Sequence, residues 1–394
     1  MQNRQQAICA RLDEYLPQLR EDVKYLHENP ETANQEYDTT AFLTRKMAEM
    51  GIEVLPTKLE TGLIAVIHGR PGGKTVGLRS DIDGLPVTEV PLGGTCSVRP
   101  GKMHACGHDA HMASLLGAAY ALQQMKDSFT GDVVLVFQPA EEVGQGSRYL
   151  LREGTLQSLH LDAMFGAHVF PNLPEGQIGL CAGPAMGALL NFSIVVRGKG
   201  AHAAMPHCAH DPVVASAAVV TALQTIASRR LNAMEPFLLS LCSIHGGTAC
   251  NVIPDEVELK GSIRFANNDL FGQIQSWLEE ISAAAAATYE CTATVTYLQE
   301  QTALVNSPEL ESAAKTAAEA VVGAENVKPL GFWMVSEDFS YYDQLCPVWF
   351  YFSGCRTEQM QSALHSPLFH AYEPTILQSA RLLAQSALEI LDAE

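Results

Sequence analysis

Apolar residues in the first half of the chain follow two alternating patterns. Helical spacing of apolar positions covers residues 7–29, 39–50 and 110–125. Short runs of apolar and β-branched residues, typical of buried strands, lie at 63–68, 75–78, 133–137 and 163–169. Helices that alternate with buried strands favour an α/β fold with a mostly parallel sheet.

The pattern changes near residue 185. Four stretches have the character of strands that are partly exposed to solvent: 191–196, 237–244, 257–265 and 292–298. Two helical patterns lie between them, at 212–228 and 270–288. Four strands and two helices predict a compact α+β domain that is inserted into the first domain. The α/β pattern resumes near residue 305 and ends in a predicted helix at 375–391.

The predicted domain organisation is therefore discontinuous. Residues 1–184 and 300–394 are expected to form an α/β catalytic domain, and residues 185–299 the inserted α+β domain. A chain of 394 residues with 47% apolar composition is long enough to bury a core in each of two domains.

Charge and cysteine content exclude several classes of function. The 44 acidic and 25 basic residues give a net charge of −19, which repels phosphate backbones and anionic lipid, so we expect no nucleic-acid or membrane partner. The polar residues 1–20 lack the apolar segment of a secretory signal, and no apolar stretch is long enough for an ordinary membrane span. The 10 scattered cysteines are typical of reduced thiols, so we expect a cytoplasmic protein.

Residues that bind metals or move protons gather where the predicted strands end. Those in or after the first-half strands are Asp81, Asp83, Glu141, Glu142 and His168. Because the carboxyl ends of parallel strands meet at one edge of a sheet, these side chains are expected to converge. Each has an ordinary alternative, since turn carboxylates accept loop amides and a histidine in an apolar run is more often a core residue.

Two further candidates lie outside these strands. Cys106 and His108 alternate along a loop just before the helix at 110–125, whose first turn would favour a thiolate at Cys106. His365 lies near the C-terminus.

Together the candidates suit a pair of divalent ions about 3.5–4 Å apart. Five residues offer suitable donor atoms, with Glu141 left over as a spare carboxylate: Cys106, His108, Glu142, His168 and His365. Mixed sulfur, nitrogen and oxygen donors fit Zn²⁺, Mn²⁺, Co²⁺ or Ni²⁺ better than Mg²⁺ or Ca²⁺.

Several ordered motifs give the chain a resemblance to a known family. They lie at 78–86, 103–111, 137–142, 166–169, 198–207, 251–255, 336–339 and 365–367. Nearly the whole chain resembles the M20 metallopeptidase superfamily, in its aminoacylase and amidohydrolase branch. That branch includes hippurate hydrolases, indole-acetyl-amino-acid hydrolases and N-acetyl-diaminopimelate deacetylases. The resemblance implies a metal-dependent amidohydrolase that cleaves the acyl–nitrogen bond of a small N-acyl amino acid.

The resemblance also implies roles for individual residues. The five candidate ligands would hold two metal ions per subunit, Mn²⁺ or Zn²⁺ in preference to Co²⁺ or Ni²⁺, with Cys106 bridging them. Glu141 would be the general base and Asp83 an orienting carboxylate. The inserted domain would act as a lid and form a homodimer.

From the inserted domain, His202 would stabilise the oxyanion, often in the active site of the partner subunit. Asn251 and Arg264 would bind substrate, and the guanidinium of Arg264 suits the carboxylate of an amino acid. Both His202 and Arg264 have ordinary alternatives, as a loop residue and as a surface charge.

One departure from the family pattern bears on substrate preference. Several glycines usually follow the position of Glu142, whereas this chain has residues 143–148 with the sequence VGQGSR.

Three rival functions remain at this stage. A dipeptidase or aminopeptidase of the same superfamily would need a pocket for a free α-amine. A thiol hydrolase would use Cys106 as nucleophile and His108 as base, although residues so close along a loop rarely align for this. A non-enzymatic binding protein would not require Glu141 together with all five candidate ligands.

Overall fold

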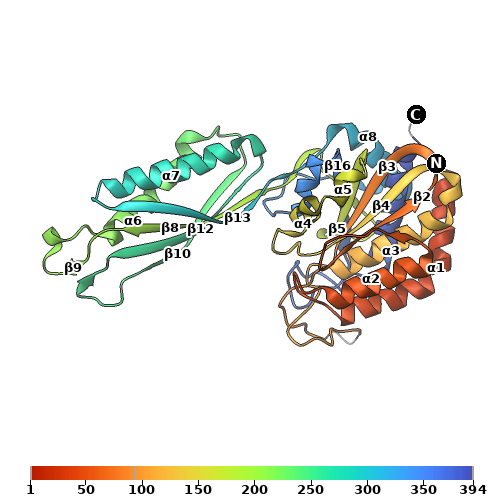
Figure 1. Cartoon of the computed structure of the whole chain (residues 1–394), viewed down its shortest axis with the longest axis horizontal. Helices are drawn as coiled ribbons and strands as arrows, with labels where there is room; N and C mark the ends of the chain where they lie inside the picture. The colour runs from red at the N-terminus through yellow and green to blue at the C-terminus, as the bar shows by residue number, and fades with distance from the viewer. Residues whose placement is uncertain (1, 92–93, 393–394) are drawn as a thin grey trace. The chain divides into compact units, whose positions relative to one another are not determined.

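The computed structural model describes residues 2–91 and 94–392, and the chain divides into two compact units (Figure 1). The large unit comprises the residues up to Ala185, Val305–Gly331 and the residues from Asp338 onward. The small unit comprises Met186–Leu304 with Phe332–Glu337.

An eight-stranded sheet with the order β1-β2-β4-β3-β5-β16-β6-β15 runs through the large unit. Its four neighbouring central strands, β4, β3, β5 and β16, are parallel, so the predicted α/β class with a mostly parallel sheet is confirmed. The strands are β1 (Glu53–Val54), β2 (Leu63–His68), β3 (Arg70–Asp81), β4 (Thr130–Gln138), β5 (Ala163–Pro174), β6 (Ile178–Leu180), β15 (Val327–Pro329) and β16 (Val348–Arg356).

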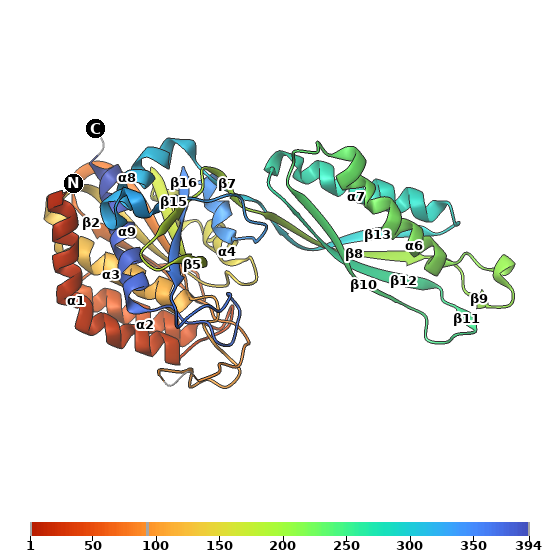
Figure 2. The same cartoon turned by 180° about the vertical axis from the view of Figure 1, so that it is seen from behind.

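Helices α1, α3 and α9 pack against one another beside this sheet, and Figure 2 shows all three. Helix α3 carries buried small residues along nearly its whole length, which lets α1 and α9 approach it closely. The helices of the large unit are α1 (Gln2–Glu28), α2 (Tyr37–Met50), α3 (His108–Gln124), α4 (Gly146–Glu153), α5 (Thr155–Ser158), α8 (Glu311–Val322) and α9 (Glu373–Leu391).

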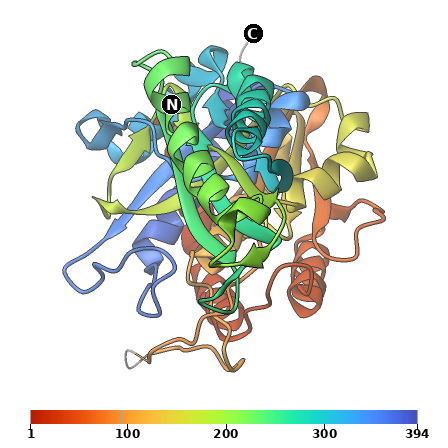
Figure 3. The ribbon, with the colours of Figure 1, turned by 90° about the vertical axis from the view of Figure 1, so that its left-hand side faces the viewer.

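The small unit contains a four-stranded antiparallel sheet with the order β10-β12-β8-β13, and two helices lie side by side against it (Figure 3). Strand β12 alternates buried with more exposed residues, as its sequence pattern predicts. The elements are β8 (Ala188–Arg197), β10 (Phe237–Gly246), β12 (Glu256–Phe265), β13 (Thr292–Gln301), α6 (Pro212–Leu223) and α7 (Phe271–Ala287).

Helix α6 is shorter than the predicted stretch at 212–228. It begins at Pro212, where the side chain of Asp211 accepts hydrogen bonds from the backbone N–H groups of Val213 and Val214. It ends at Leu223, and a π-helical turn, Ile226–Arg230, takes the rest of the helical pattern. The wider turn changes the backbone hydrogen bonding but leaves Ile226 buried.

Two short strand pairs complete the fold. Strands β9 (Ala201–His202) and β11 (Val252–Ile253) form an antiparallel ribbon in the small unit, and β7 (Gly183–Met186) pairs with β14 (Leu304–Asn306). Within the described part of the chain, no helix has the length and apolarity needed to cross a bilayer.

Candidate metal centre

The strand order of the large unit brings the predicted metal-binding residues to one edge of its sheet. Strand β3 ends at Asp81, and its neighbour β4 ends at Gln138, shortly before Glu141 and Glu142. On the other side of β3, strand β5 carries His168. These strands run parallel, so the candidate residues of β3, β4 and β5 converge as expected.

Two groups of three donor residues share one thiol. The donor atoms of Cys106, His108 and His168 all lie within 4.8 Å of one another, as do those of Cys106, Glu142 and His365. We call these the histidine triad and the carboxylate triad. The Sγ of Cys106 lies 3.4 Å from Nε2 of His168, and Nε2 of His365 lies 3.5 Å from Oε2 of Glu142. All five predicted ligands therefore come together, with Cys106 common to both triads.

Unpartnered polar atoms show that this site suits cations. Nε2 of His108 and Oε1 of Glu142 are buried, yet these atoms have no hydrogen-bond partner among the described residues. Each such atom costs about 1–3 kcal/mol unless something else satisfies it. The Sγ–Nε2 distance of 3.4 Å is also close to the roughly 3.6 Å expected for sulfur and nitrogen on one tetrahedral zinc ion. The donor set therefore fits divalent metal ions.

The pKa values of the buried side chains, without a bound cation, also indicate that the site favours added positive charge. Burial raises the pKa of Glu142 to about 7. For His108, burial acts to lower the pKa, but the carboxylates of Asp81 and Asp83 outweigh it and raise the pKa to about 10. The cluster thus takes up protons when only its own side chains supply the charge.

The expectation that the start of helix α3 favours a thiolate at Cys106 is wrong for these side chains alone. Burial, followed by the charges of Glu142 and Glu141, raises the pKa of Cys106 well above its usual range. The carboxylates therefore dominate over the helix dipole. A neutral thiol in this setting is a poor nucleophile, which weakens the thiol-hydrolase alternative.

Asp83 holds the backbone of Glu141 and Glu142 in place through hydrogen bonds. Its Oδ1 accepts the N–H of Glu141 at 3.1 Å, and its Oδ2 accepts the N–H of Glu142 at 3.0 Å. Its Oδ1 also lies 3.3 Å from Nδ1 of His108. A single buried carboxylate therefore contacts the segments that carry the candidate base and two candidate ligands.

Two residues near the centre adopt left-handed backbone conformations. Ala140, just before Glu141, has φ 54°, and its N–H donates to the buried carboxylate of Glu36 at 2.9 Å. His365 has φ 63°, and its N–H donates to the carbonyl of Ala105 at 2.8 Å. This conformation is costly for residues other than glycine, so these hydrogen bonds hold strained loops in place.

Several buried polar residues surround the centre, and of these only Asp81 was a candidate from the sequence. They form a network behind the triads: Arg79, Asp81, His111, Gln138 and Asp338. Arg79 and Asp81 come just after the predicted strand at 75–78, and charged residues that continue a buried strand need partners. That placement was the one sequence signal that could have identified them.

In the small unit the ribbon brings two of the predicted residues together. His202 pairs with Val252, the residue after Asn251, and the carbonyl of Asn251 accepts the N–H of Ala203. Nδ1 of His202 accepts the N–H of Ala204 at 3.1 Å. The proton of a neutral His202 is therefore on Nε2, which is free to act as a donor.

Arg264 lies on the four-stranded sheet, near the end of β12 that is far from the ribbon in sequence. Arg264 is eight residues from Glu256 along β12, which is about 26 Å at roughly 3.3 Å per residue. Glu256 in turn closely follows the ribbon strand β11 in the sequence. Arg264 is half-buried, and its Nη1 donates to Oγ of Ser336 at 3.0 Å. Within the small unit, Arg264 is therefore not assembled with His202 and Asn251.

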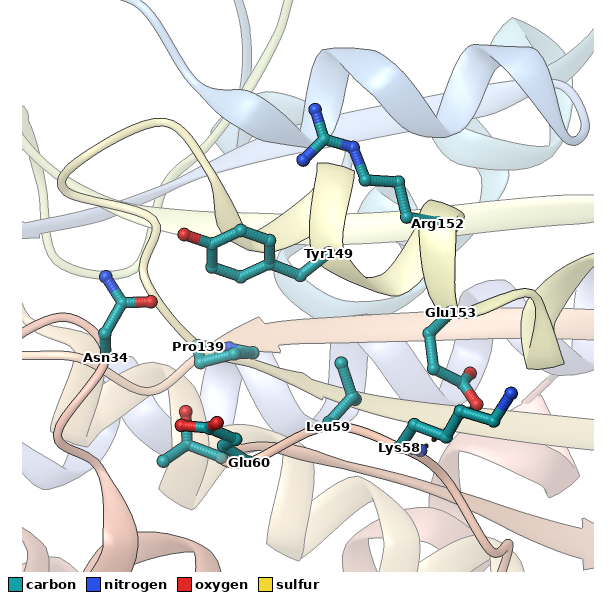
Figure 4. Close-up of a pocket in the computed structure, with 9 residues that line it drawn as sticks. Asn34, Lys58, Leu59, Glu60, Pro139, Tyr149, Arg152 and Glu153 are labelled. Atoms are coloured by element: carbon teal, nitrogen blue, oxygen red, sulfur yellow. Dashed lines mark hydrogen bonds between the residues drawn. The ribbon is translucent and has the colours of Figure 1, made fainter.

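A cavity of about 430 Å³ lies beside the metal centre but is distinct from it. Pro139 forms part of its wall, and Tyr149, Arg152 and Glu153 reach it from α4 (Figure 4). The described residues that line this cavity do not include a candidate ligand.

Comparison with known proteins decides the family. Residues 77–389 match the model of peptidase family M20/M25/M40. The chain belongs to this family.

Individual members of the family align over most of their length. The chain is 36% identical to N-acetyl-L-cysteine deacetylase of Bacillus subtilis over 94% of this chain and 87% of that protein. It is 35% identical to IAA-amino acid hydrolase ILR1-like 5 of Arabidopsis thaliana, over 93% of this chain and 85% of that protein. The crystal structure of the YXEP protein of Bacillus subtilis, described as a dinuclear metal-binding peptidase of the M20 family, is 30% identical with a TM-score of 0.84, over 97% of this chain and 100% of that one.

Proposed function

We propose that this protein is a metal-dependent amidohydrolase that cleaves the acyl–nitrogen amide bond of N-acyl amino acids. The observation that carries the proposal is the pair of triads that share Cys106, with the carboxylate of Glu141 beside them. The names of the relatives support the bond and the substrate class, since one removes an acetyl group from cysteine and another hydrolyses an amino-acid conjugate.

Two divalent cations would occupy the centre, as the dinuclear relative suggests. Cys106, His108, Glu142, His168 and His365 would hold them, with Cys106 common to both triads, and Mn²⁺ or Zn²⁺ would fit this donor set. The cations would lower the pKa of a water molecule and polarise the acyl carbonyl of the substrate.

The protein groups would then manage the proton and the developing charge. Glu141 would accept the proton of the attacking water and deliver it to the leaving amine. Asp83 would keep the backbone of Glu141 in place through its bond to that N–H. His202 would donate from Nε2 to the oxyanion of the tetrahedral intermediate.

The small unit would act as a lid and as the dimer interface. Strand β10 lies at the edge of its sheet, and Leu238 and Ile244 on this strand are 48% and 57% exposed. An edge strand with exposed apolar residues is suited to pair with a second chain. Arg264 is separated from the ribbon, which supports two different placements. His202 and Asn251 would act in the active site of the partner subunit, whereas Arg264 would bind the substrate carboxylate in the active site of its own subunit.

We also propose a cytoplasmic location and a domain division at 1–184 and 300–394 against 185–299. All ten cysteines are free, as expected in a reducing compartment.

A screen of substrates tests the proposed function. Protein loaded with Mn²⁺, Zn²⁺ or Co²⁺ should release amino acids from N-acetyl, N-benzoyl or N-indoleacetyl conjugates, and a chelator should abolish the release. Faster cleavage of free dipeptides would favour the dipeptidase alternative. Release that survives complete metal removal would refute the proposal.

A further inference from the structure

A chain of buried hydrogen bonds connects Arg79 to the strand that carries His168. Nη1 of Arg79 donates to Oδ2 of Asp81 at 2.7 Å, and the other oxygen of Asp81 lies 2.7 Å from Nδ1 of His111. Nε2 of His111 accepts the backbone N–H of Val169 at 2.9 Å. The side chains of Arg79, Asp81 and His111 are all nearly inaccessible to solvent.

The partners of His111 define its protonation. A backbone N–H can only donate, so Nε2 of His111 must carry a lone pair toward Val169. The proton of this neutral imidazole is then on Nδ1, where it is donated to Asp81. Both ring nitrogens are thus used, and His111 has no lone pair left for a metal ion, although it lies beside His108.

Val169 also orients His168, through its backbone carbonyl. Nδ1 of His168 lies 2.7 Å from the carbonyl oxygen of Val169, which can only accept, so Nδ1 carries the proton. Nε2 of His168 then carries the lone pair, and it is this atom that lies 3.4 Å from Sγ of Cys106. Val169 is therefore bonded through its N–H to His111 and through its carbonyl to His168.

We propose that His111 is a positioning residue for the histidine triad. By holding the N–H of Val169, it fixes the carbonyl that orients His168, so that Nε2 of His168 is directed at the cation shared with Cys106 and His108. Glu142 and His365 of the carboxylate triad are not bonded by any of these groups. This inference rests on the proposed function, because it assumes that the triads bind cations.

The two hydrogen bonds of His111 can be removed separately. The amide nitrogen of an asparagine lies close to the position of Nδ1, so His111→Asn keeps the bond to Asp81 and loses the bond to Val169. The amide oxygen of a glutamine reaches toward the position of Nε2, so His111→Gln keeps the bond to Val169 and loses the bond to Asp81. Each variant leaves one buried polar group without its partner, so the two serve as matched controls for stability.

Titration of the metal-free variants with Co²⁺ and Mn²⁺ tests the inference. In His111→Asn we expect one of the two cations to bind 10- to 100-fold more weakly, as is typical when a group that orients a ligand is lost, while the other cation binds as in the wild type. In His111→Gln both affinities should stay within about 3-fold of the wild type, and thermal melting should show similar losses of stability in both variants. Should His111→Asn not fold, His111→Ala is compared with His111→Gln instead: the Ala variant loses both hydrogen bonds, and the Gln variant shows what loss of the bond to Asp81 alone contributes.

Equal affinities in the Asn and Gln variants, or an equal weakening of both cations, would overturn the inference and leave His111 with a purely structural role. A wild-type protein that binds fewer than two cations would instead overturn the proposed function, so the two failures are distinguishable.

Discussion

The residues predicted to carry the chemistry lie in two contrasting settings. In the large unit, Cys106, His108 and His168 are buried and contact one another or shared partners. In the small unit, His202 and Asn251 are exposed on a short ribbon. The candidate metal ligands thus all lie in the large unit, whereas the candidate oxyanion and substrate residues lie in the small unit. Substitutions in the two units should therefore affect different measurements.

The largest effect is expected for Glu141→Gln in the large unit. Loss of the general base should lower kcat by about 10²–10⁴-fold, because the amide cannot take up the proton of the attacking water. The metal content should remain close to the wild-type value, which atomic absorption on the purified variant would check. A variant that kept most of its turnover would show that another group is the base.

A smaller loss is expected for His202→Ala in the small unit. Removing one donor to the oxyanion should lower kcat by about 10²–10³-fold while cation affinity stays unchanged. His207, which is also exposed and lies near the same ribbon, provides the matched control, since His207→Ala should leave kcat unaltered. Weakened metal binding in His202→Ala would contradict the division between the two units.

Arg264→Ala should act on substrate binding more than on turnover. Loss of a charged hydrogen bond of about 1.5–3 kcal/mol would raise KM about 10- to 100-fold with a smaller change in kcat. Arg197, whose side chain is exposed and pairs with Glu256 on the same sheet, is the control. A variant with an unchanged KM for N-acyl amino acids would exclude Arg264 as the carboxylate site.

The smallest effect concerns the stability of the large unit and its dependence on pH. Burial acts to lower the pKa of His27, but hydrogen bonds to Asp109 and Glu89 outweigh it and raise the pKa to about 10. A raised pKa in the folded state means that protonated His27 stabilises the fold fully below its unfolded value of 6.5 and loses this effect as the pH rises through 10.

His27→Gln should therefore destabilise the protein more at pH 6 than at pH 9. Urea unfolding at both pH values would measure it, and His68→Gln is the exposed control, since His68 pairs with Asp132 at the surface. An equal loss of stability at the two pH values would contradict a charged His27.

Much of the fold followed from local patterns. The apolar run at 63–68 coincides with β2, and the alternation at 257–265 coincides closely with β12, because burial on one or both faces leaves a clear trace in the sequence. The two-residue strands of the ribbon are too short to show a period. Helix α6 could not be bounded from its pattern either, since a π-helical turn continues the apolar spacing.

The family and its hydrolase class followed from the ordered motifs, and the match to the family confirms the family prediction. Glu142 and His168 could be recognised from their places at predicted strands, and Cys106, His108 and His365 from their residue types and motifs; the roles of all five stay predictions. The network behind them could not be predicted, because Arg79 and Asp338 are 259 residues apart and pair only in the folded chain. The proposed role of His111 could not be predicted from local sequence either, because this role depends on which group faces each ring nitrogen.

The number of cations bound per chain tests whether the two triads form a two-cation site. Metal-free protein should be titrated with Co²⁺ while the absorption of a thiolate bound to cobalt and the hydrolysis of an N-acetyl amino acid are followed together. We predict two cations per chain, a thiolate signal that disappears in Cys106→Ser, and activity that reaches its plateau with the second cation. Saturation at one cation per chain, or full activity before any cation is added, would contradict this prediction.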